Sequence, residues 1–132
     1  MDEAIVERLV LEWDDVYKKG QLSFWVLLAI YEKRKYAVEI TEFMKEVSNG
    51  DFEVKEQSLY RALRRFKSMG LVTISEEDSP NSGPKRKYYG LSAIGIAVLK
   101  EFTVRNIKPL NTPKIISLLH AVESEAINYE NN

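Results

Sequence analysis

The sequence predicts a mainly α-helical protein with one small β-hairpin, and three features of the chain predict it. Apolar residues recur at helical spacing through most of the chain, most clearly in residues 55–69. A short β-branched run, residues 71–75, follows a glycine of the kind that ends helices. A turn-rich linker then leads to a second extended segment, residues 83–91, which carries three consecutive cations near its start. A helix followed by a basic hairpin is the order of a winged helix-turn-helix.

The N-terminal part of the chain is expected to form two helices. Residues 2–19 carry an apolar stripe that includes Leu9 and Trp13, and Gly20 is expected to end this helix. The stripe is wide for a surface helix, which indicates a second buried contact. Residues 21–34 are apolar almost without interruption, so they are expected to form a second helix at the centre of the core.

Two further helices precede the hairpin. The first, residues 36–47, follows a polar break at residues 32–35 where the chain is expected to turn. Its inward side chains are expected to be Tyr36, Ile40, Phe43, Met44 and Val47. The second is the helix at residues 55–69, whose inward side chains are expected to be Leu59, Ala62, Leu63, Phe66 and Met69. Its opposite face then presents Gln57, Arg61, Arg64 and Ser68.

The C-terminal part is expected to add two helices. Ser92 is a good N-cap for a helix that runs to about residue 105, and Gly95 inside its first turn indicates a packing constraint. Thr112 is expected to cap a last helix with Pro113 at its first position. The apolar residues of this helix are spaced for a coiled contact, at Ile115, Leu119, Val122 and Ala126.

Length and composition limit the class of protein. A chain of 132 residues is expected to form one domain, or one domain with an appended helix. The second arrangement is a winged-helix part, residues 1–107, and a C-terminal dimerisation helix, residues 108–132. The absence of cysteine excludes disulfides and thiolate chemistry. No apolar run approaches the roughly 18 residues of a membrane span and no charged leader is present, so a cytoplasmic protein without membrane contact is expected.

Charge is distributed unevenly along the chain. The net charge is -1, yet residues 55–90 hold eight cations and four anions, a balance of +4 that leaves -5 for the remainder. A basic face on an otherwise acidic molecule favours local contact with phosphates. The winged-helix order and this charge pattern together predict binding to double-stranded DNA.

The residues expected to contact DNA lie on the second of the helices before the hairpin and on the basic strand. Arg61 or Arg64 suits bidentate pairing with guanine and Gln57 suits adenine, whereas the alternative is that these are only solvated helix charges. The full set is Lys55, Gln57, Ser58, Tyr60, Arg61, Arg64 and Arg65 on the helix, with Lys85, Arg86 and Lys87 on the strand. Strand alternation places Arg86 and Lys87 on opposite faces, so they are not expected to point into one groove.

No catalytic, metal or cofactor site is expected. His120 is the only histidine and the chain lacks cysteine, so a metal site is disfavoured and no nucleophile–base arrangement is recognisable. Trp13 and Trp25 could stack on a small aromatic effector, but packing in a core or a dimer interface is the more common role of such residues.

Three motifs resemble the PadR family of winged-helix transcriptional regulators, over residues 20–95. Residues 36–40, Tyr-Ala-Val-Glu-Ile, look like the family's Tyr-Gly-Tyr-Glu-Ile. Residues 58–66 are similar to its Leu-Tyr-Pro-Ala-Leu-Arg-Arg-Leu signature. Residues 83–92 look like its wing, Gly-Pro-x-Arg-Lys-Tyr-Tyr-x-Leu-Thr. The resemblance implies a DNA-binding homodimer, often responsive to a small molecule, with the first and last helices at an interface made by Leu9, Trp13, Ile115, Leu119 and Val122.

The chain departs from the family pattern at three positions. Ala37 and Val38 stand where the family has Gly and Tyr, so the phosphate contact of that Tyr cannot be assigned to Val38. Arg61 stands where Pro is usual, which restores a backbone donor and adds a possible DNA contact.

The expected function is therefore that of a dimeric winged helix-turn-helix regulator, a repressor in the simplest case. Two recognition helices related by a twofold axis would reach major grooves about 34 to 36 Å apart, so a near-palindromic operator is expected. The alternative is a winged helix that serves as a protein-interaction module, in which the basic hairpin binds an acidic partner without reading a DNA sequence.

Overall fold

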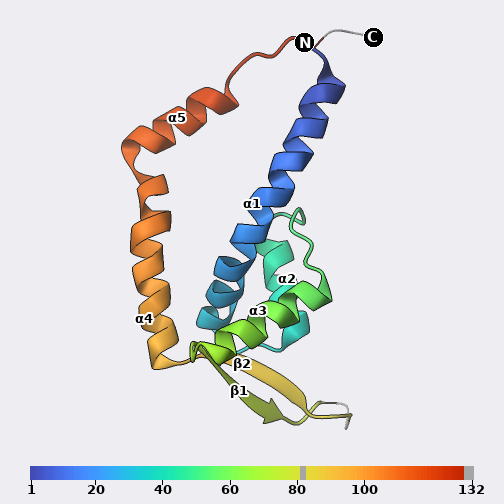
Figure 1. Ribbon diagram of the computed structural model, residues 1–132, viewed down its shortest axis with the longest axis vertical. Coiled ribbons are helices and arrows are strands. Elements are labelled where there is room, and N and C mark those ends of the chain that lie inside the picture. Colours follow the sequence, from blue (N-terminus) through green and yellow to red (C-terminus); the bar gives the residue numbers. More distant parts are fainter. Residues whose placement is uncertain (81–82, 130–132) are drawn as a thin grey trace. The chain divides into compact units, whose positions relative to one another are not determined.

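The computed structural model describes residues 1–80 and 83–129 (Figure 1). Asn81 and Ser82 of the predicted linker and residues 130–132 of the predicted C-terminal segment lie outside the described part. The chain forms two compact units. One comprises residues 18–99 and holds the hydrophobic core, and the other comprises residues 1–17 together with the chain from residue 100 onward.

The N-terminal part is one continuous helix, α1 (Glu3–Glu32), in place of the two predicted helices. The prediction that Gly20 ends the first helix is therefore wrong. A single glycine inside a helix costs only about 1 kcal/mol relative to alanine, which helix-favouring neighbours on both sides offset. Gly20 also lacks the positive φ that helix-ending glycines adopt, whereas Gly70 has it, with a φ of 79°.

The core of the 18–99 unit is built by three helices. They are α1, α2 (Ala37–Val47) and α3 (Glu56–Ser68). The buried side chains follow the predicted helical spacing and include Val26, Ile30, Ile40, Met44, Leu59, Leu63 and Phe66. Two predicted inward residues are instead exposed, Met69 at 59% and Val47 at 42%. Val47 ends α2 and Met69 lies just past the end of α3, where the helical path no longer directs the side chain at the core.

The hairpin is a two-stranded antiparallel sheet of β1 (Val72–Glu77) and β2 (Arg86–Leu91). Its register pairs Val72 with Leu91 and Glu77 with Arg86. One face carries Ile74 and Tyr89 and packs on the core. Lys35 extends the sheet on the other side of β2, because its N–H donates to the Tyr89 carbonyl at 3.0 Å and its carbonyl accepts from the Tyr89 N–H at 2.8 Å.

After the hairpin the chain forms α4 (Ala93–Phe102), a π-helical turn η1 (Thr103–Ile107), a 3-10 turn η2 (Lys108–Asn111) and α5 (Pro113–Glu123). The two predicted caps are confirmed. The Ser92 Oγ accepts from the Gly95 N–H at 3.0 Å, and the Thr112 Oγ1 accepts from the Ile115 N–H at 3.4 Å. Ala126 lies beyond the end of α5, so the helix carries a shorter apolar stripe than predicted.

Residues 1–17 and 100–129 form no buried core of their own. None of these residues is buried, and their apolar side chains include Trp13, 75% exposed, and Val122, 69% exposed. Large apolar surface left in water is unusual in a stable protein and marks an interaction surface.

Gly95 provides the first test of the fold. A Cβ at this position would overlap the backbone carbonyl of Leu71, which cannot move without disturbing the start of β1. Gly95→Ala is therefore expected to lower the free energy of unfolding by about 1 to 3 kcal/mol in urea titrations. The matched control is Gly20→Ala, which meets no atom within 4 Å and is expected to raise it by up to about 1 kcal/mol. Equal stability of Gly95→Ala and the wild type would contradict this packing.

Candidate nucleic-acid interface

The outward face of α3 is polar and basic, as its periodicity predicts. Gln57, Arg61 and Arg64 are exposed, while Tyr60 is half-buried and packs against the core. Glu56 lies in the first turn, and Arg65 and Lys67 lie in the last, the placement that the helix dipole favours. The core thus fixes the rotation of α3, and this rotation directs its hydrogen-bond donors toward solvent.

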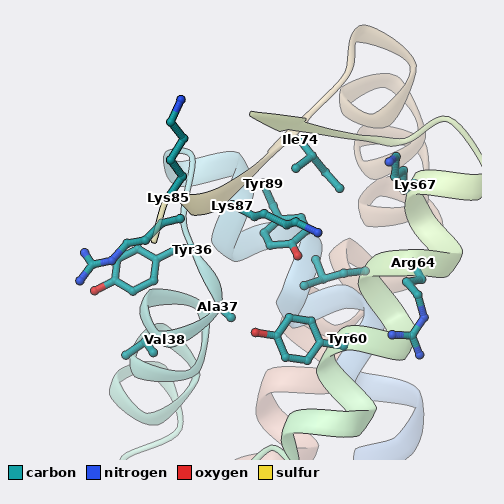
Figure 2. Close-up of a pocket in the computed structure, with 12 residues that line it drawn as sticks. Tyr36, Ala37, Val38, Tyr60, Arg64, Lys67, Ile74, Lys85, Lys87 and Tyr89 are labelled. Carbon is teal, nitrogen blue, oxygen red and sulfur yellow. The ribbon is translucent and has the colours of Figure 1, made fainter. Parts of the chain in front are cut away.

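A groove of about 690 Å³ separates α3 from the hairpin and the start of α2. Figure 2 shows Tyr60 and Arg64 on the α3 side, with Lys87 and Tyr89 on the β2 side and Ala37 and Val38 at the start of α2. The remaining lining residues are Tyr36, Leu63, Lys67, Ile74, Lys85 and Arg86. Five of the twelve lining residues are cations and none is an anion, so the groove suits an anionic ligand.

The two faces of β2 contribute differently to this groove. Lys87 lies on the same face as Tyr89, whereas Arg86 lies on the opposite face with Tyr88, as strand alternation predicts. Both Arg86 and Lys87 nevertheless line this groove of the protein, and the expectation that they do not point into one groove of DNA stays a prediction. Arg86 lines the protein groove because Tyr36 forms part of the groove wall on the outer face of β2 and holds Arg86 there.

Arg86 is held by an aromatic stack. Its guanidinium carbon lies 4.4 Å from the centre of the Tyr36 ring, a cation–π distance. The Tyr36 ring in turn meets the Tyr88 ring edge-on, with 5.5 Å between the ring centres. The Glu39 carboxylate accepts from the Tyr36 N–H at 3.3 Å and so fixes the start of α2 beneath this stack. A guanidinium held in this way loses less freedom when it binds an anion.

The Tyr89 hydroxyl remains a hydrogen-bond donor at neutral pH. Burial raises the pKa of Tyr89 above its ordinary value of 10.0, and the nearby Tyr60 raises it further, against a smaller opposing effect of Arg64. The phenol therefore stays protonated and presents a neutral donor beside the cations of the groove.

A second, smaller depression of about 310 Å³ lies at the start of α3. It is lined by Glu56, Gln57, Tyr60, Arg61 and Arg64. Tyr60 and Arg64 line both this depression and the larger groove, so seven of the ten predicted DNA-contacting residues fall on two adjoining parts of one surface.

Three predicted contact residues lie outside both depressions: Lys55, Ser58 and Arg65. Lys55 is the exposed N-cap residue of α3, and Ser58 is half-buried in its first turn. The Arg65 guanidinium donates to the Ser23 Oγ on α1 at 2.8 Å, which draws it toward the body of the unit.

Two residues that the sequence reasoning missed hold the hairpin. Arg34 donates to the Thr73 Oγ1 at 3.1 Å, to the Ser75 Oγ at 3.0 Å and to the Tyr88 carbonyl at 3.2 Å. The polarity of residues 32–35 predicts only a break between two helices. The sequence offered one signal for this role, a basic pair directly before the Tyr36 motif. That signal does not identify the partners of Arg34, which lie 39 to 54 residues away in the sequence.

Lys35, the second missed residue, is a lysine only 3% exposed to solvent. Its Nζ donates to the Ala29 carbonyl at 2.6 Å and to the Glu32 carboxylate at 2.9 Å, and lies 5.1 Å from the centre of the Phe43 ring. The ammonium thus satisfies a carbonyl of the last turn of α1, where the helix dipole favours a cation.

The residues predicted for other roles are distributed as follows. Leu9, Trp13, Leu119 and Val122 are exposed and Ile115 is half-buried. Trp25 packs against the core and meets Phe24 edge-on at 6.0 Å between ring centres.

His120 is exposed, and no group of three or more His, Cys, Asp or Glu side chains that could hold a metal occurs in residues 1–80 and 83–129. Within the same described ranges, no helix has the length and apolar character that crossing a membrane requires.

The chain is similar to a known family of proteins. Residues 26–101 match the model of the transcriptional regulator PadR-like family, which is more than half of the chain. The matched region contains α2, α3, the hairpin and α4 up to its last residue, and so includes every residue that lines the larger groove.

Individual relatives agree with this match. A PadR-like transcription factor from Bacteroides fragilis has a similar structure, with a TM-score of 0.62 and 29% identity over 83% of this chain and 98% of its own. A PadR family transcription regulator from Clostridium difficile R20291 has a TM-score of 0.54 and 27% identity over 68% and 94%. An uncharacterised protein of Lysinibacillus sphaericus is 32% identical over 63% of this chain and 75% of its own.

Lys35 provides a test of how the groove is supported. Lys35→Met keeps the aliphatic bulk but leaves the buried Ala29 carbonyl without its donor, and is expected to lower the free energy of unfolding by about 1 to 3 kcal/mol in urea titrations. The control is Lys33→Met, which removes a largely exposed ion pair to Glu39 at 3.6 Å and is expected to cost less than about 1 kcal/mol. Equal losses in the two variants would contradict the role given to Lys35.

Proposed function

The chain belongs to the PadR-like family of transcriptional regulators, and from this premise we propose that it binds double-stranded DNA as a homodimer. In this proposal α3 enters the major groove and the hairpin contacts the adjacent backbone. Regulators of this family are in general not enzymes, and the proposed activity is binding alone. A regulator of genomic DNA would act in the cytoplasm.

One observation supports this proposal most directly. The groove between α3 and the hairpin brings together Arg64 and Lys67 from the helix with Lys85, Arg86 and Lys87 from the wing, although the chain as a whole carries a net charge of -1. Concentrating cations on one concave surface of an otherwise acidic protein favours a polyanion and repels it elsewhere.

The proposed contacts divide by type. Gln57, Arg61 and Arg64 are exposed on the outward face of α3 and are proposed to read base edges in the major groove. Lys55, Ser58, Tyr60, Arg65, Lys85, Arg86 and Lys87 are proposed to contact phosphates and so to set register and affinity. Arg65 would have to give up its hydrogen bond to Ser23, which makes it the least favourable of these contacts.

The exposed apolar surface supports the homodimer. Trp13 on α1 and Leu119 and Val122 on α5 are each more than half exposed, and a second copy of the chain would cover surface of this kind. We propose that residues 108–132 serve as the dimerisation segment of a winged-helix part at residues 1–107. A twofold dimer would bind a near-palindromic operator with half-sites about 34 to 36 Å apart, and bound over a promoter it would act as a repressor.

A small aromatic effector is a second element of the proposal. Trp13 lines a shallow depression of about 290 Å³ with Val10, Asp14 and Tyr17. Two aromatic rings and an aliphatic side chain at one place provide a stacking surface for a flat ligand.

The competing function is protein interaction through the same basic groove, with an acidic partner in place of DNA. The two functions differ in what they require of the ligand, because DNA recognition needs a donor pattern on α3 matched to base edges whereas an acidic protein needs only charge. A sequence-dependent affinity among duplexes of equal length therefore favours the proposed function.

Substitutions on α3 test the reading face. Arg64→Ala and Arg61→Ala are each expected to weaken binding to a selected operator duplex by about 1 to 3 kcal/mol, because a bidentate contact to guanine is lost. Fluorescence anisotropy titrations of the folded dimers measure this loss. The control is Lys45→Ala, which removes an exposed cation from α2 outside both depressions and is expected to change affinity little. Unchanged affinity in both arginine variants would refute the proposed reading face.

Substitutions on α5 test the dimer. Leu119→Glu and Val122→Glu introduce charges that must be desolvated in an apolar interface, and are expected to convert the dimer to a monomer in gel filtration with light scattering. Met69→Glu is the control, since Met69 is equally exposed but belongs to the 18–99 unit. A dimer that persists in both α5 variants would show that this helix is not the interface.

A further inference from the structure

The outer face of the hairpin is covered by a three-residue segment between α1 and α2, Arg34–Tyr36. The Arg34 guanidinium bonds the hydroxyls of Thr73 and Ser75 on β1 and the carbonyl of Tyr88 on β2. One side chain therefore joins both strands of the hairpin to the end of the α1 segment. Tyr36 meets the Tyr88 ring on the same face and stacks beneath Arg86.

Gly90 provides the space that Arg34 occupies. Its φ is not positive, so the backbone at this position does not itself require glycine. A Cβ added there would instead meet the Arg34 side chain at its guanidinium and its Cγ, with 3.1 Å to the Cγ. The glycine thus has a packing role, and that role depends on the arginine lying across the sheet.

The backbone beneath Arg34 is anchored on both sides. Lys35 pairs with Tyr89 through two backbone hydrogen bonds, and its buried ammonium is bound to the last turn of α1. The hairpin is therefore attached to the core along β2 by the Lys35 backbone and across its outer face by Arg34 and Tyr36. The cations of the wing, Arg86 and Lys87, extend from this attached strand.

We propose that Arg34 is a positioning residue for DNA recognition, which holds the hairpin so that Arg86 and Lys87 meet the phosphates beside the major groove. In this proposal Arg34 acts through the wing, because three of the five N–H donors of its guanidinium are already used within the protein. The inference deepens the proposed function and rests on it.

The first experiment removes the contact in two chemically different ways. Arg34→Gln deletes the guanidinium, whereas Gly90→Ala keeps every charge and displaces Arg34 from its place. Both variants are expected to bind operator DNA roughly tenfold more weakly than the wild type at fixed salt, equivalent to about 1.4 kcal/mol. Wild-type affinity in Gly90→Ala together with a loss in Arg34→Gln would indicate a direct charge effect and overturn the inference.

Each variant has a matched control. Lys33→Gln removes a cation one residue away from Arg34, at a side chain that pairs with Glu39 and not with the hairpin. Gly83→Ala adds the same methyl group to another glycine of the hairpin region, where the nearest atom is 3.9 Å away. Both controls are expected to bind within about twofold of the wild type. Thermal unfolding and gel filtration establish that all variants are folded and in the same oligomeric state.

The second experiment is a double-mutant cycle in a background that lacks the two cations of β2, Arg86→Gln with Lys87→Gln. If Arg34 acts by positioning these residues, adding Arg34→Gln to this background is expected to cost less than about twofold, and the salt dependence of binding is expected to remain that of the background. Additive losses would overturn the inference while leaving the proposed function intact. A protein without the two cations of β2 that binds as tightly as the wild type would also overturn it. A wild-type protein that binds no duplex would overturn the proposed function and this inference together.

Discussion

Lys35 attaches the hairpin to the core through both its backbone and its side chain. Its backbone adds a third partner to a two-stranded sheet, and its ammonium is buried against the last turn of α1. A two-stranded hairpin in isolation is marginally stable in water. Because the buried cation has a carbonyl, a carboxylate and an aromatic ring as partners, its desolvation is compensated, and the hairpin gains a fixed position from which β2 presents its cations.

The basic groove follows from this attachment together with the rotation of α3. Burial of Leu59, Leu63 and Phe66 directs Arg64 and Lys67 away from the core, and pairing of β2 with Lys35 places Lys87 and Tyr89 across from them. Neither element alone forms a concave surface. The net charge of the chain is only -1, yet cations are concentrated in this groove. The reason is that α3 and β2, which lie on either side of the turn-rich linker in the sequence, are held on opposite sides of the groove.

The chain divides its apolar residues between two uses. In residues 18–99 many of them fill a core, with Val26, Ile40 and Leu59 nearly inaccessible to solvent, although others such as Ile94 are exposed. In residues 1–17 and from residue 100 onward they remain exposed on helices that are well formed, such as α5 with its Thr112 cap. Capping and propensity stabilise such helices locally, and their exposed apolar faces are the surface that the proposed dimer would cover.

The sequence by itself determined those features that depend on residues close together in the chain. The buried face of α3, the positive φ of Gly70 and the caps at Ser92 and Thr112 were all predictable, because helical periodicity and capping act over three or four residues. The PadR motifs likewise identified the family through short local patterns.

Only the tertiary structure decided the rest. Whether α1 continues through Gly20 depends on a free-energy difference of about 1 kcal/mol between a continuous and an interrupted helix. Local sequence patterns do not determine the sign of so small a difference. The roles of Arg34 and Lys35 depend on partners as far as 54 residues away, and Arg86 shares a groove with Lys87 because Tyr36 holds it there. Such contacts are set by which surfaces the core brings together, and no periodicity within one segment encodes them.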